Sequence, residues 1–159
     1  MSDIVEEAGL SRDAFYRHFA SKEDLVAAIV DAGEIRLVGY LRHQMEKESD
    51  PAAQVRRWIE GILSQAGNRD VAHSTRAVLW NGGRVGDGSR PDAAKSSGRL
   101  AELLVAPVEA LGSIDPVRDA VSIAHATIGL MQEFLWRFAA PTKDDVAHLV
   151  RFCSAAVRP

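Results

Sequence analysis

Apolar residues recur along most of this chain with the spacing of an α-helix. Between residues 51 and 66, for example, Val55, Trp58, Ile59 and Ile62 follow one another at intervals that place them on one helical face. The same spacing predicts further helices over 22–48, 70–80, 91–111, 117–138 and 143–157. Strand-like alternation is almost absent, so the sequence predicts an all-α fold.

Prolines and glycines divide these predicted helices. Pro51 and Pro116 each follow an aspartate and fit the first turn of a helix. Pro107 falls inside the helix expected at 91–111, where the loss of an amide donor should kink or split it. Residues 81–92 are rich in glycine and are expected to form a mobile loop. Their glycine spacing matches neither a P-loop nor a dinucleotide-binding fingerprint.

The first 25 residues have the pattern of a helix-turn-helix. Gly9 suits the left-handed backbone that ends one helix, and Ser11 can cap the next by accepting a backbone N–H. Ser21 then begins a third segment, with Asp24 at the capping-box position. In DNA-binding proteins of this kind the second helix enters the major groove N-terminus first. The pattern therefore indicates DNA binding.

The same stretch resembles the tetracycline-repressor-like (TetR) family of bacterial transcription regulators. The distinctive part is Tyr-x-His-Phe-x-x-Lys-x-x-Leu, which runs from Tyr16 to Leu25. The matching residues are Ile4, Ala8-Gly9-Leu10-Ser11, Phe15-Tyr16-Arg17-His18-Phe19 and Ser21-Lys22-Glu23-Asp24-Leu25. The resemblance implies a partial DNA-binding head over 1–32 and a helical ligand-binding and dimerisation domain over 33–159.

The family's DNA-binding domain has three helices, and this chain begins at the second. We therefore expect either that Met1 is an internal methionine of a longer gene product or that the DNA-binding head is weakened. The second alternative leaves a regulatory, ligand-binding dimer that has lost DNA binding. A small α-helical enzyme is a further alternative, although no residue pattern supports it.

The resemblance also implies roles for individual residues of the head. Lys22 would contact the DNA backbone, and Arg12 would face the bases, since arginine can bridge O6 and N7 of guanine. Ala14 stands where the family often has threonine, which leaves the operator sequence open. The expected DNA-binding residues are Ser2, Ser11, Arg12, Asp13, Ala14, Tyr16, Arg17, His18 and Lys22. The alternative is that these side chains form a solvated helix face.

Large aromatic side chains and histidines in the helical region are candidates for a small-molecule site. Pockets of that kind combine apolar walls with a few polar groups, and the resemblance implies an effector, here expected to be apolar or aromatic. The predicted lining residues are Trp58, Trp80, His73, His125, Met131 and Phe134. Ordinary core packing is the competing interpretation, and for any one of these residues it is the better one.

The helix expected at 117–138 carries two apolar stripes, so it needs burial on two sides. One stripe alternates four and three residues as a heptad does. A two-fold homodimer in which each chain gives two helices to a four-helix bundle would cover it. The predicted interface residues are Val121, Ala124, Ile128, Met131, Leu135, Val146, Val150 and Cys153. The sequence leaves open which of the two stripes faces the partner.

The composition of the chain reduces the number of possible functions further. A formal net charge of −3 gives no global basic footprint, so DNA binding must rest on a local cluster. A single cysteine fits a reducing cytoplasm, and no apolar stretch has the length needed to span a membrane. The histidine spacing suggests no metal site, and no catalytic motif or cofactor fingerprint is present. The sequence thus predicts a cytoplasmic, non-enzymatic, ligand-responsive transcription regulator without a cofactor, most simply a repressor that binds double-stranded operator DNA.

Overall fold

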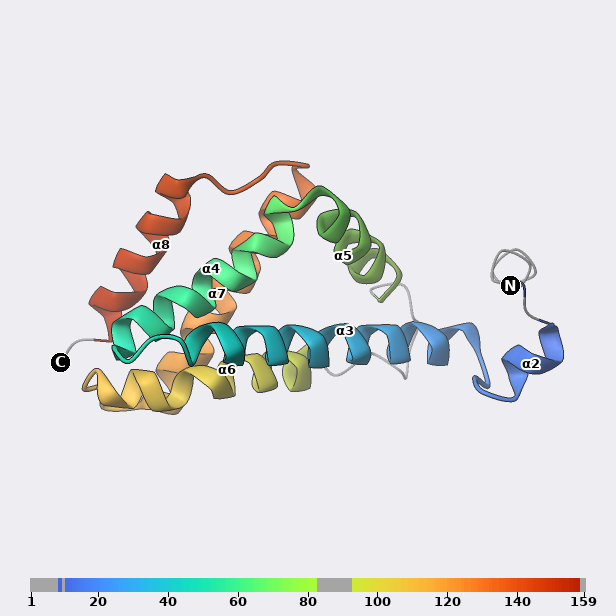
Figure 1. Ribbon diagram of the computed structural model, residues 1–159, viewed down its shortest axis with the longest axis horizontal. Coiled ribbons are helices and arrows are strands. Elements are labelled where there is room, and N and C mark those ends of the chain that lie inside the picture. Colours follow the sequence, from blue (N-terminus) through green and yellow to red (C-terminus); the bar gives the residue numbers. More distant parts are fainter. Residues whose placement is uncertain (1–8, 10, 83–92, 158–159) are drawn as a thin grey trace.

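The computed structural model describes residue 9, residues 11–82 and residues 93–157 of the chain. All regular structure in these ranges is helical (Figure 1). The helices are α2 (Arg12–Tyr16), α3 (Lys22–Met45), α4 (Pro51–Gly67), α5 (Arg69–Gly82), α6 (Ala93–Ala110), α7 (Pro116–Trp136) and α8 (Lys143–Ala156). The predicted all-α fold is confirmed.

Side-chain caps fix where several of these helices begin. The hydroxyl of Ser11 accepts a hydrogen bond from the Ala14 amide at 3.1 Å, and Ser21 does the same for the Asp24 amide at 3.1 Å. Asp50 caps α4, which begins with Pro51. These caps satisfy amides that have no partner inside the helix. The caps predicted at Ser11 and Ser21 are confirmed.

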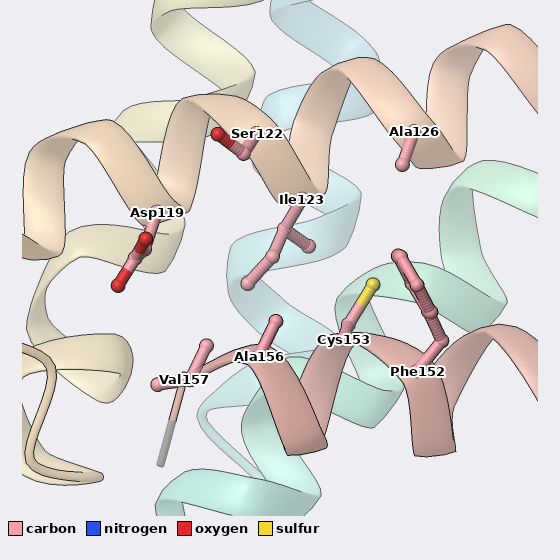
Figure 2. A pocket seen from close by; sticks show the side chains of 8 residues that line it. All are labelled: Asp119, Ser122, Ile123, Ala126, Phe152, Cys153, Ala156 and Val157. Carbon is pink, nitrogen blue, oxygen red and sulfur yellow. The ribbon is translucent and has the colours of Figure 1, made fainter. Parts of the chain in front are cut away.

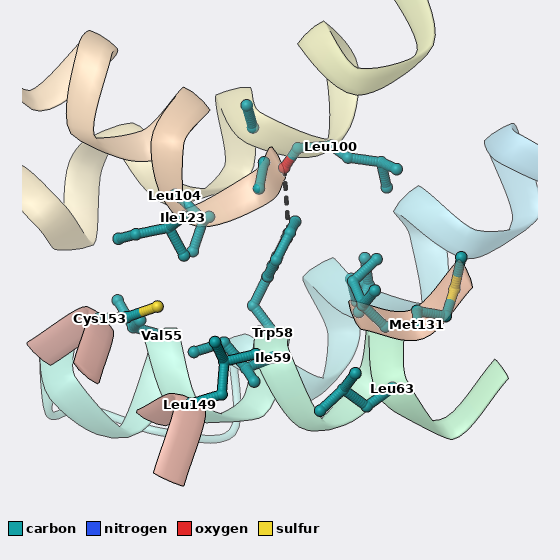
Figure 3. Close-up of a cluster of buried hydrophobic side chains, with 14 of the residues drawn as sticks. Val55, Trp58, Ile59, Leu63, Leu100, Leu104, Ile123, Met131, Leu149 and Cys153 are labelled. Carbon is teal, nitrogen blue, oxygen red and sulfur yellow. Dashed lines mark hydrogen bonds between the residues drawn. The ribbon is translucent and has the colours of Figure 1, made fainter. Parts of the chain in front are cut away.

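Helix α4 is the centre of the helical body, since it packs against α3, α5, α6, α7 and α8. Its Trp58 is completely buried, and the indole Nε1 donates a hydrogen bond to the Leu100 carbonyl of α6 at 3.0 Å (Figure 3). Ile59, Ile62 and Leu63 of the same helix belong to the same buried cluster and are 1% exposed or less. The apolar face predicted for this helix therefore forms the core.

Helix α3 joins this body to the N-terminal head. Its C-terminal half packs into the body, where Leu41 and Met45 are buried. Its N-terminal end projects beyond the other helices of the body, and α2 lies beyond that end (Figure 1). In the described part of the chain, the backbone of α2 approaches no other helix. The head is therefore positioned by α3.

Two sequence-based expectations differ from the observed helices. Helix α6 is not split at Pro107, which is buried within it, and it continues to Ala110. A proline removes only its own amide donor, and here the helix ends within one further turn. The loop expected at 81–92 begins later, because α5 extends to Gly82. The rest of that segment, 83–92, lies outside the described residues.

Candidate nucleic-acid interface

The head is built on a short, well-capped helix. Gly9 has a φ of +64°, the left-handed conformation predicted for the turn before α2. After the capped start at Ser11, α2 spans five residues. The amides of His18 and Phe19 then donate to the Phe15 carbonyl at 2.9 and 3.0 Å. These hydrogen bonds form a tight turn after α2, which leads directly to α3.

Aromatic packing orients the side chains of α2. Phe15 is 5% exposed, stacks edge-on against Tyr16 at a centroid distance of 5.3 Å and lies 5.5 Å from the Phe19 ring. Phe19 and Ala14 are half-buried. The inward orientation predicted for these three residues is confirmed. Tyr16, in contrast, is 57% exposed.

Most of the predicted DNA-contacting residues for which the structure describes a side chain lie on the surface. These exposed residues are Ser11, Asp13, Tyr16, Arg17, His18 and Lys22. Ser11 also holds the helix cap, so its hydroxyl already has one hydrogen-bond partner in the Ala14 amide. Ala14 is half-buried rather than exposed. Ser2 and the side chain of Arg12 lie outside the described residues.

The charges on this surface are mixed. Arg17 and Lys22 are cationic, whereas Asp13 lies in the first turn of α2, and Glu23 and Asp24 lie in the first turn of α3. Acidic side chains suit those positions because a helix N-terminus carries partial positive charge. Among the described side chains of the head, cationic groups therefore lie among acidic ones.

The predicted effector-site residues that the structure describes differ in burial. Trp58 and Met131 belong to the buried core and are 0% and 7% exposed (Figure 3). Phe134 is half-buried, and His73 and His125 are exposed. The side chain of Trp80 lies outside the described residues. The structure thus places the apolar members in ordinary core packing, with the indole hydrogen already used by Leu100.

The predicted dimer residues also divide into two groups. Five of them are buried within a single chain and offer a partner no surface: Ala124, Met131, Leu135, Val150 and Cys153. Ile128 and Val146 are half-buried, and Val121 is 37% exposed. The reason lies in α7, which packs against both α6 and α4 and therefore buries residues of both apolar stripes.

Sequence reasoning missed the exposed residues beside this stripe. Phe152 is 61% exposed and lines a cleft between α7 and α8 with Ser122, Ala126 and Ala156 (Figure 2). The sequence contains an indication of this exposure. Phe152 does not lie on the apolar face predicted for α8, so its ring falls on the polar side of the helix. Cys153 lies at the base of the cleft, and burial raises the pKa of its thiol to about 11.

Other kinds of site find no support in the described residues. No group of three or more histidine, cysteine, aspartate or glutamate side chains there could hold a metal ion. Among the same residues, no helix has both the length and the apolar character needed to cross a membrane.

Comparison with known proteins supports the interpretation of the head. Residues 1–29 match the family model described as "Bacterial regulatory proteins, tetR family". The match covers α2 and ends within α3, and so includes every predicted DNA-contacting residue. No curated protein and no solved structure matches the chain. The N-terminal region of the chain, with its capped helix and exposed polar face, is therefore similar to the DNA-binding part of bacterial regulatory proteins of the tetR family.

Proposed function

We propose that the protein is a homodimeric repressor that releases operator DNA in response to a small apolar or aromatic effector. The observation that carries this proposal is the position of α2. It is capped at Ser11, exposes Tyr16, Arg17 and His18, and stands clear of the helical body (Figure 1). A helix presented in this way can enter a major groove without a clash from the other described helices.

The proposed contacts with DNA are of two kinds, to phosphates and to base edges. Tyr16, His18 and Lys22 would hold phosphates and set the register of the head, which adds affinity for any sequence. Arg17 and Arg12 would read base edges, with Asp13 and Ala14 next to them. Two heads of a dimer would bind half-sites about 34–36 Å apart, or a multiple of that distance.

Helix α3 would transmit the effector signal. It has 24 residues, so it is about 36 Å long, and it joins the head at 1–32 to the helical region at 33–159 without a break. On α6, Arg99 pairs with Asp31 of α3 at 2.8 Å and with Glu34 at 3.8 Å. An effector that changes the packing of α4 or α6 would therefore shift α3 and the spacing of the two heads. It can do so only as far as it binds one arrangement more tightly than the other.

Fluorescence anisotropy on a palindromic promoter fragment and on random DNA of equal length tests the DNA contacts. Arg17→Ala should weaken binding to the palindromic fragment by about 1–3 kcal/mol, because a base contact is lost. Its effect on binding to random DNA should be much smaller. Lys22→Ala should weaken binding to both DNAs alike, because a phosphate contact is lost. It should also reduce the slope of log K against log salt concentration by about one unit per half-site.

Lys47→Ala is the matched control, because Lys47 is an exposed lysine that follows α3 at the end distant from the head. This variant should bind both DNAs as the unmodified protein does. If Arg17→Ala and Lys22→Ala lose the same affinity on both DNAs, the division of roles is wrong. If the unmodified protein binds neither DNA in a salt-dependent way, the chain is instead a ligand-binding dimer without DNA binding.

A further inference from the structure

The buried ring of Phe15 shows which side of α2 faces away from the packing of the head. Phe15 is 5% exposed, and successive residues of an α-helix are rotated by about 100°. Asp13 and Arg17 lie two residues before and two residues after Phe15, so each is rotated by about 160° from the buried ring. Tyr16 and Ala14 are rotated by only about 100° and lie at the sides. Asp13 and Arg17, both exposed, therefore form the centre of the outer face of α2.

These two side chains are oppositely charged and one helical turn apart. The Arg17 amide donates to the Asp13 carbonyl at 3.2 Å, so the two residues are separated by about 6 Å along the helix axis. Charges at this spacing can form an ion pair, as Glu133 does with Arg137 at 3.0 Å at the end of α7. Asp13 is shorter than a glutamate by one methylene group, and it forms no ion pair with Arg17. Within the described residues, neither side chain has a hydrogen-bond or ion-pair partner.

The pair presents a hydrogen-bond acceptor beside a donor, since a carboxylate only accepts and a guanidinium only donates. The major-groove edge of a C·G base pair has the complementary order, with the N4 amino group of cytosine beside the O6 and N7 acceptors of guanine. The amino group of adenine lies beside its own N7 acceptor, an arrangement that suits the amide of asparagine rather than a carboxylate. The chemistry of Asp13 and Arg17 therefore matches a C·G pair better than an A·T pair.

A carboxylate at this position contributes more to discrimination than to affinity. It is repelled by the phosphates of any DNA, and opposite a base without an amino donor it would lose water without gaining a hydrogen bond. A cytosine amino group offsets that loss. The simpler role for Asp13 is to stabilise the start of α2, where negative charge is favourable. Glu23 is the second residue after the cap of α3, as Asp13 is after the cap of α2, so it provides a direct comparison.

We propose that Asp13 determines the sequence specificity of the head by accepting a hydrogen bond from N4 of a cytosine. Arg17 donates to O6 and N7 of the guanine in the same base pair or in the next one. This inference rests on the proposed function, in which α2 enters the major groove, and it names the base pair that the head selects. It also gives Asp13 a role separate from helix stability, because a change in the stability of α2 would not exchange one preferred base for another.

Selection from a duplex DNA library with a randomised centre tests this inference on the full chain. The unmodified protein should select a sequence with a C·G pair in each half-site. Replacing that pair in one half-site should weaken binding roughly 5- to 150-fold. Asp13→Asn should select A·T at the same position, because the asparagine amide can bond N6 and N7 of adenine. It should also bind random DNA more tightly, because a charge that repels phosphates is removed.

Two further variants separate base recognition from helix stability. Asp13→Glu keeps the carboxylate and should keep the preference for cytosine. Glu23→Gln removes one negative charge from the same place in α3 and should leave every base preference unchanged. Circular dichroism shows whether each variant keeps its helices. If Asp13→Asn does not fold, Asp13→Ser takes its place, and it should lose the preference for cytosine because a hydroxyl both donates and accepts.

The outcomes distinguish this inference from the proposed function. If the unmodified protein binds DNA but selects no sequence, or if Asp13→Asn selects the same bases, the role of Asp13 is wrong while DNA binding stands. The same holds if the base that changes is not cytosine. Base preferences that change in Glu23→Gln as much as in Asp13→Asn would also overturn the role, since loss of charge alone would then explain both. If the unmodified protein shows no salt-dependent binding to any DNA, the proposed function itself is wrong.

Discussion

At Gly61, α4 and α3 approach each other so closely that a single added methyl group tests their packing. A Cβ built on Gly61 would overlap Cδ2 of Leu41 and would lie 3.4 Å from Cε1 of Tyr40. Leu41 is 0% exposed, so its side chain can move away only by displacing other core atoms. We therefore expect Gly61→Ala to destabilise the protein.

Two opposing terms set the size of this effect. Alanine is more favourable than glycine inside a helix by about 0.8–1.0 kcal/mol. Overpacking a filled core costs about 1–3 kcal/mol. The second term is the larger, and a net loss of about 1 kcal/mol corresponds to a fall in Tm of about 2–4 °C for a chain of this length. Thermal unfolding followed by circular dichroism measures this difference directly.

Gly39→Ala supplies the matched control, because Gly39 is an exposed glycine in α3 with no atom within 4 Å of the added Cβ. That variant gains helix propensity without a clash and should raise Tm. Leu41→Ala should also cost less in the Gly61→Ala background than in the unmodified protein, since the two sites share one space. A Tm for Gly61→Ala raised as much as that for Gly39→Ala would refute the close-packing argument.

Two further predictions concern helix ends near α8. Hydrogen bonds from the side chain and amide of Thr142, at 2.6 and 2.8 Å, hold the pKa of Asp145 below its usual 3.8. Asp145→Asn should therefore lower Tm at neutral pH, and the difference should shrink as the pH falls below 3.8, where the native carboxylate becomes protonated. Phe138 follows α7 with a φ of 53° and lies under the Arg76 guanidinium at 4.4 Å. Phe138→Gly should be more stable than Phe138→Ala by about 1 kcal/mol, because glycine adopts this conformation without strain; equal Tm values would contradict this.

Helix ends could be predicted because their causes are local. Ser11 and Ser21 cap helices through amides three residues along the chain, and Pro51 begins α4 directly after the capping Asp50. None of these interactions depends on the rest of the fold. The apolar face of α4 was predictable for a similar reason, since its residues point the same way whatever covers them.

The environment of α7 could not be predicted in this way. Its sequence shows two apolar stripes, but their burial depends on which helices lie against them. Ile123 and Ala124 are neighbours on different stripes, and both are buried because α7 packs against α6 and α4 at once. Phe152, on another helix, is 61% exposed although the spacing of α7 gives no indication of it. The spacing of apolar residues within one helix does not reveal which other helices pack against it.

In the candidate sites, too, features with local causes could be predicted, whereas features that depend on distant contacts could not. The exposure of Tyr16 and the burial of Phe15 follow from the pattern of α2. The effector residues were expected from composition, and Trp58 belongs instead to the core through its bond to Leu100. A tryptophan that satisfies its indole inside the core stabilises the fold without offering that group to a ligand.

The separation of α2 from the body limits how the head can be controlled. Within the described residues, α2 approaches no other helix, so the body acts on it only along α3. Leu41 anchors α3 against Gly61 of α4, and Arg99 holds Asp31 nearer the head. Because α3 also packs against α5, an effector would move α2 only through a change in the packing of α3 on α4, α5 or α6. In the proposed mechanism, the effector alters the packing of α4, α5 or α6 on α3. Variants at Leu41 and Arg99 should change the response to it while the exposed face of α2 keeps its contacts with DNA.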